Sequence, residues 1–196
     1  LPEPAAARPP MSARVLEQGR WHATDALRLV ILASIPLAWL IAGPPSAAAM
    51  LLVLGGSMLT RIAPVSSAVD LTTQAVLLAA AWCATLGLYE TVAALDLVAH
   101  VASGAVLALL ARALLLQAGL LPGGDGGRAA TARMLHVVSG VALLGLLWEL
   151  GEWAGNALIT TAIRVGYTDT LSDLVADVVG AVVAVVVAEL ARRRAA

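Results

Sequence analysis

Long apolar runs separated by short polar breaks dominate the chain. Six runs stand out, and each approaches the roughly 20 residues that an α-helix needs to cross a bilayer. Gly43-Pro44-Pro45 separates the first two runs, and a polar stretch from residue 120 to 133 separates the fourth from the fifth. The six runs cover approximately residues 26–43, 46–63, 69–91, 94–118, 132–156 and 169–191.

The length of these runs and their lack of alternating polarity predict helices. Strands of a membrane barrel would appear as short segments of alternating polarity, whereas these runs are long and do not alternate. In lipid, a helix also satisfies its backbone hydrogen bonds internally. We therefore predict an all-α, polytopic membrane bundle of about six transmembrane helices. The second run contains Gly55-Gly56 and is modest in length, so a re-entrant segment remains an alternative there.

Composition supports the same class. Hydrophobic residues make up 60% of the 196 residues and charged residues 13%, against about 25% charged in soluble domains. Residues 1–22 are rich in Pro and Ala and are predicted to be a disordered tail, which leaves residues 23–196 as one transmembrane domain. No basic patch with interleaved aromatic residues is present, so nucleic acid is not an expected partner. Membrane lipids are the expected partners.

The arginines predict the orientation, because cytoplasmic loops of membrane proteins carry an excess of basic residues. With the N-terminus in the cytoplasm, only Arg164 falls on the outer side. Both termini are therefore predicted to be cytoplasmic, and the compositional bias favours a bacterial inner membrane. The arginines then placed inside include Arg14, Arg20, Arg28, Arg61, Arg112, Arg128, Arg133 and Arg192 to Arg194.

Acidic residues gather where the last three predicted helices meet the outer surface. Within each helix their spacing is three or four residues, which places them along one helical stripe. Ionisable side chains are not tolerated facing lipid, so these stripes should face the interior or a water-filled cavity. The groups are Asp96 and His100 in the fourth run, Glu149 and Glu152 in the fifth, and Asp169, Asp173 and Asp177 in the sixth.

Crowded carboxylates repel one another unless protons or a cation neutralise them. Carboxylates and an imidazole on neighbouring helices form metal sites in helix bundles. We therefore predict a divalent metal, with Zn, Mn, Fe and Mg all compatible with these ligands. The predicted ligands are Asp96, His100, Glu149, Asp169, Asp173 and Asp177.

Simpler structural roles compete with this prediction. In these alternatives, Asp169 caps a helix and does nothing else. Glu152 is solvated at the membrane interface, and Asp96 with His100 forms a hydrogen-bonded pair that fixes packing. Elsewhere, Asp70 is expected to cap the third helix, and Glu189 is expected to be a solvated partner of the arginines that follow it.

The second half of the chain resembles the DUF2238, or YjdF-like, family of small bacterial membrane proteins of unknown function. The resemblance covers roughly residues 87–185 and implies six helices, but no activity. The family often has an acidic residue where this chain has Ala113, so an ionic pair between these two positions is not expected. The matching positions are Asp96, His100, Gly104 and Arg112; Glu149, Glu152 and Trp153; and Asp169, Thr170, Asp173, Gly180 and Ala181.

Three functions are compatible with these residues. The first is a membrane-embedded, metal-dependent hydrolase or lipid-modifying enzyme, with Glu149 or Glu152 as the general base. The second is a proton- or cation-coupled transporter, although no inverted repeat is visible. The third is a non-catalytic subunit of a membrane complex or a homo-oligomer.

Overall fold

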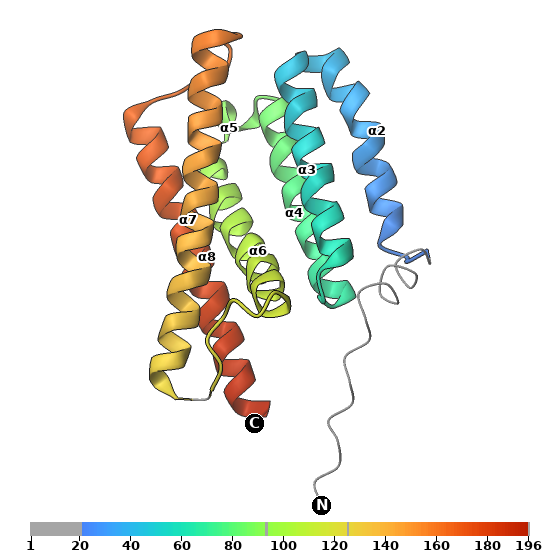
Figure 1. Cartoon of the computed structure of the whole chain (residues 1–196). Coiled ribbons are helices and arrows are strands. Elements are labelled where there is room, and N and C mark those ends of the chain that lie inside the picture. The colour runs from blue at the N-terminus through green and yellow to red at the C-terminus, as the bar shows by residue number, and fades with distance from the viewer. Residues whose placement is uncertain (1–20, 93, 125, 196) are drawn as a thin grey trace, which may run out of the picture.

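The chain folds into two three-helix units that lie side by side (Figure 1). The computed structural model describes residues 21–92, 94–124 and 126–195, and these residues contain helices and no strands. The prediction of an all-α bundle is therefore confirmed for this part of the chain. Most of the predicted N-terminal tail, residues 1–20, lies outside the described residues.

The first unit comprises α2 (Asp25–Ala42), α3 (Pro44–Ile62) and α4 (Ser67–Thr85). Gly43 ends α2 with a φ of 82°, and two prolines begin α3 directly afterwards. Proline suits this position because the first turn of a helix lacks partners for its N–H groups. The residues from Pro44 to Ile62 form one continuous helix, as a full membrane crossing requires.

The third predicted run ends earlier than expected. Gly87 adopts a left-handed backbone conformation with a φ of 66°, which an α-helix cannot continue. The chain then makes the single turn α5 (Leu88–Thr91). Hydropathy does not register this break, because the residues on both sides of Gly87 remain apolar.

The second unit comprises α6 (Leu95–Gln117), α7 (Gly127–Leu158) and α8 (Tyr167–Ala195). The helix α7 begins five residues before the predicted run, since the Ala-rich turns after Gly127 favour a helix although they are polar. The start of α6, the end of α7 and the start of α8 lie at the same end of the molecule (Figure 1). The residues predicted to form the site are thus carried to one end of the second unit.

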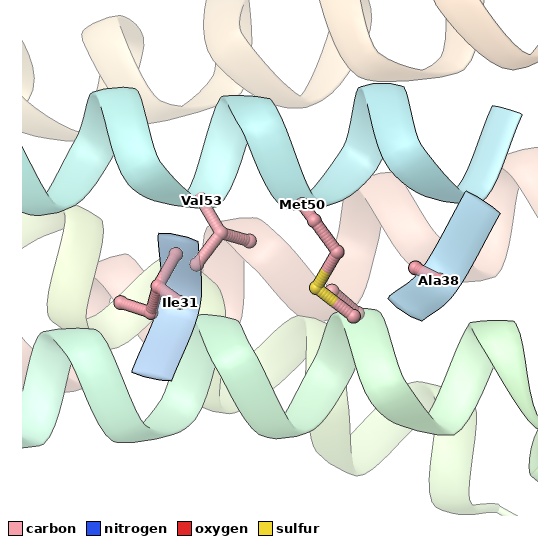
Figure 2. Packing of buried hydrophobic residues seen from close by; sticks show 5 residues of the cluster. Ile31, Ala38, Met50 and Val53 are labelled. Atoms are coloured by element: carbon pink, nitrogen blue, oxygen red, sulfur yellow. The ribbon is translucent and has the colours of Figure 1, made fainter. Parts of the chain in front are cut away.

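Each unit has its own apolar core. In the first unit, Ile31, Met50 and Val53 are packed between α2, α3 and α4 (Figure 2). In the second unit, a core of small side chains joins α6, α7 and α8. Its fully or almost fully buried members are Ala108, Val137, Val141, Ala181 and Val185.

The outer surface of the bundle is apolar. Six helices in the described part of the chain are long and apolar enough to cross a membrane, with mean hydropathies from 1.3 to 2.4. Leu40 and Leu158 are each 81% exposed, and many other leucines and valines point outward. A surface of this kind is stable only against lipid, so the chain is a multi-pass membrane protein.

Candidate functional site

Glycine allows α6 and α8 to pack almost backbone to backbone. A side chain at Gly104 would overlap the backbone of Asp177, and one at Gly180 would overlap the carbonyl of Val101. On α7, Gly145 leaves room for the carboxylate of Asp177, which would lie 2.6 Å from an added Cβ. Small residues commonly permit such close approach in membrane bundles. Here they hold Asp177 at the junction of the three helices.

The imidazole of His100 lies at the centre of the polar cluster. Its Nδ1 is 3.2 Å from Oδ1 of Asp177. Its Nε2 faces the other way, 3.7 Å from Oδ1 of Asp96 and 3.9 Å from Oδ2 of Asp173. These two distances are too long for direct hydrogen bonds. Nε2 therefore faces two carboxylates without a direct hydrogen bond to either.

Asp96, His100 and Asp173 present one donor atom each within 4.8 Å of one another. The Asp173 side chain is only 6% exposed, whereas that of Asp96 is 31% exposed, so the group extends from the interior toward the surface. Two carboxylate oxygens and one imidazole nitrogen are a donor set suited to a divalent metal. Because three protein donors do not fill a metal's coordination sphere, such a centre would keep positions for water or substrate.

The remaining predicted ligands lie around this group. Asp177 contacts the far side of the His100 ring. Glu149 is buried, and Asp169 in the first turn of α8 is exposed; both are close enough for their charges to interact with each other. Glu152 is half-buried and interacts electrostatically with Glu149 and His100. The structure thus places all seven groups at one end of the second unit but brings only three into metal-ligand spacing.

Tyr89 in α5 was not singled out from the sequence. Its hydroxyl donates a hydrogen bond to the carbonyl of Ala80 at 2.8 Å. Burial raises the pKa of the Tyr89 phenol above its ordinary value, and the charges of Asp96, Glu152 and Asp173 act in the same direction. The phenol therefore stays protonated at the edge of the cluster. The glycine before this short helix was the only available signal, since it redirects the chain toward α6.

Glu189, expected to be solvated, is buried at the opposite end of the second unit. It accepts two hydrogen bonds from Arg133 on α7, at 2.9 and 2.7 Å. Arg133 also donates to the carbonyls of Pro122 and Gly124, which fixes the connection between α6 and α7. The expected pairing with a following arginine is confirmed, because Nε of Arg192 lies 3.2 Å from Glu189. The expected solvation was wrong, because Arg133 lies 56 residues away, beyond the reach of local charge spacing.

Asp70, expected to be a cap, is a buried ion-pair partner instead. Ser66 caps α4, and Oδ1 of Asp70 lies 2.6 Å from Nη2 of Arg28. Thr60 and Gln74 donate to the same oxygen, at 2.5 and 2.8 Å. The network joins α2, α3 and α4 and completes the polar interior of the first unit.

Two apolar recesses are lined by residues outside the cluster. One, of about 150 Å³, lies between Thr73 of α4 and Val106 of α6. The other, of about 360 Å³, follows the face of α6 that includes Leu97 and Val101. Neither contains an ionisable side chain, so we assign the chemistry to the cluster around His100.

These features define a multi-pass α-helical membrane protein with a partly buried Asp–His cluster at one end of its second three-helix unit. The profile of the family described as predicted membrane protein (DUF2238) matches residues 25–194, so the chain belongs to this family. The resemblance found in the second half of the sequence is thereby confirmed and extends over the first three helices. No curated protein and no solved structure gives a significant match.

Proposed function

We propose that the protein binds a divalent metal ion through Asp96, His100 and Asp173 and uses it in a hydrolytic reaction at the outer face of a bacterial inner membrane. The observation that carries this proposal is the position of the His100 ring between Asp177 on its Nδ1 side and two carboxylates on its Nε2 side. A metal-binding histidine usually donates its second ring N–H to a carboxylate, which fixes the tautomer and directs the other nitrogen to the metal.

The surrounding residues have complementary roles in this proposal. Asp177 orients the imidazole, and Gly104 and Gly180 hold its helix against α6. A divalent metal bound here would polarise an oxygen of the substrate or make its bound water more acidic. Glu149 and Glu152 are the carboxylates available to accept a proton, because neither belongs to the three grouped donors. The substrate would arrive at the exposed side of Asp96.

Transport is less well supported. A path through the second unit would have to pass the buried core that contains Val137, Val141 and Val185. Beyond that core, Glu189 is already occupied by Arg133. A continuous chain of ionisable groups, which a proton or cation relay requires, therefore does not run between the two ends of the described helices.

Metal content tests the binding proposal. Protein in lipid nanodiscs, dialysed against a mixture of Zn, Mn, Fe and Mg, would be analysed by mass spectrometry of its elements. We expect stoichiometric metal in the wild type and loss of it in His100→Ala and Asp173→Asn. The matched controls are His136→Ala, an exposed imidazole on α7, and Glu90→Gln, an exposed carboxylate. Wild-type protein without metal, or equal metal in site and control variants, would rule out the site.

Turnover tests the hydrolytic role separately. Chromogenic phosphate and carboxylic esters, presented to the metal-loaded protein, are suitable first probes. If Glu149 or Glu152 is the general base, Glu149→Gln or Glu152→Gln should keep the metal and lower turnover by about 10²- to 10⁴-fold. Metal retention together with unchanged turnover in both variants would contradict the assignment of the base.

A further inference from the structure

The end of the second unit opposite the His100 cluster brings three arginines to one carboxylate. Arg112 of α6, Arg133 of α7 and Arg192 of α8 all lie around one carboxylate, that of Glu189. Both carboxylate oxygens of Glu189 accept hydrogen bonds from Arg133, and Nε of Arg192 lies 3.2 Å from one of them. Three guanidinium groups therefore gather around the carboxylate of Glu189.

Arg112 is the least compensated of the three. Its Nη2 lies 3.8 Å from Glu189, which is beyond hydrogen-bond distance. Its Nε is buried and has no hydrogen-bond partner in the described part of the chain. The side chain is nevertheless 21% exposed, so the outer part of the guanidinium reaches the surface. Arg112 therefore has no carboxylate within hydrogen-bond distance in the described part of the chain, and an anion at its exposed side would provide one.

The depth of Arg112 indicates where such an anion would come from. Arg112 lies five residues before the end of α6 at Gln117. Beyond it, Leu116 and Leu120 are 40% and 63% exposed and apolar. Arg112 thus lies inside the candidate membrane span Leu95–Gln117, close to its end. Long arginine side chains near the end of a span extend toward the headgroups, so a headgroup is the anion within reach of this guanidinium.

We propose that this surface, formed by Arg112 and Arg192 and anchored by Arg133 and Glu189, binds the phosphate of an anionic phospholipid. A planar guanidinium binds a phosphate through two parallel hydrogen bonds, and basic recesses between membrane helices recognise anionic headgroups. The acyl chains would cover exposed apolar side chains nearby, such as Leu116 and Leu190. The site is independent of the His100 cluster and of its proposed metal.

Thermal unfolding in a neutral detergent tests this site with three additions: phosphatidylglycerol, phosphatidylcholine and inorganic phosphate. A ligand that binds only the folded state raises the unfolding temperature. We expect phosphatidylglycerol to stabilise the wild type and the other two to have little effect. Equal stabilisation by phosphatidylcholine would overturn recognition of the charge. Equal stabilisation by inorganic phosphate would mean that the ligand is a soluble anion and not a lipid.

Variants locate the binding. Arg112→Gln should require about fivefold more phosphatidylglycerol for the same shift, as expected for the loss of one arginine near a membrane surface. Arg192→Gln, which alters a more exposed side chain, gives a second test if Arg112→Gln does not fold. Arg128→Gln removes an exposed arginine at the same end and should respond like the wild type. Equal responses of all three variants would show general surface attraction and refute the site.

Discussion

The carboxylate of Asp177 contacts His100 without belonging to the three grouped donors. If it orients the ring for a metal, Asp177→Asn should weaken metal affinity by about 10- to 100-fold, the usual effect of losing such a partner. Competition with a chromophoric chelator measures the affinity. Glu90→Gln changes an exposed carboxylate outside the predicted ligands and should have little effect. Unchanged affinity in Asp177→Asn would remove the basis for the positioning role.

Two ion pairs of similar composition should differ strongly in their effect on stability. Asp70→Ala leaves the buried Arg28 without its main partner, and we expect a loss of about 3–5 kcal/mol in the free energy of unfolding. Glu90→Ala breaks a pair whose Arg164 is 76% exposed, so at most about 1 kcal/mol should be lost. Reversible unfolding in mixed micelles measures both. Similar losses would mean that burial of Arg28 does not decide the outcome.

Single residues also show which contacts can be predicted from sequence spacing. The stripe that contains Asp96 and His100 was predictable, because a spacing of four defines one face of a helix. The distant partners of Asp70 and Glu189 were not, since Arg28 and Arg133 lie 42 and 56 residues away. Which acid is buried depends on how helices pack, and local spacing carries no information about that. The same reason explains why only three of six predicted ligands come into metal-ligand spacing.

At the scale of elements, the second unit is organised by a repeat of four residues. On α6, positions 100, 104, 108 and 112 carry His, Gly, Ala and Arg; on α8, positions 173, 177, 181, 185 and 189 carry Asp, Asp, Ala, Val and Glu. Each stripe therefore passes from the acidic end, through small apolar residues, to the arginine end. The small residues bring the helices together, and this contact fixes the spacing of the polar groups at both ends.

The α6–α8 contact should be sensitive to a single methyl group. Because a Cβ at Gly104 would overlap the backbone of Asp177, Gly104→Ala should separate the helices and cost about 1–3 kcal/mol. Gly140→Ala is the matched control on α7, where an added Cβ meets nothing within 4 Å; it should be neutral or stabilising by up to about 1 kcal/mol. Unfolding in mixed micelles would compare them. A neutral Gly104→Ala would indicate a looser contact than the structure shows.

At the scale of the whole molecule, the two units share a plan but differ in chemistry. Arg28 and Asp70 close the interior of the first unit at one end, whereas the carboxylates around His100 gather at the other end of the second. Hydropathy was sufficient to predict six helices and their order, because each crossing needs its own apolar run. The division into two separate cores was not predictable, since apolar residues cover both the interior and the lipid-facing surface.

The orientation of the bundle in the membrane decides whether each site faces the cytoplasm or the outside. The arginine count predicts that the α6–α7 connection is cytoplasmic and the α7–α8 connection external. In a Cys83→Ala background, Gly123→Cys and Thr161→Cys place one thiol at an exposed position in each connection. A membrane-impermeant maleimide should label Thr161→Cys on intact cells and Gly123→Cys only after lysis. The reverse pattern would place the His100 cluster in the cytoplasm, and a hydrolase acting at the outer face would then be excluded.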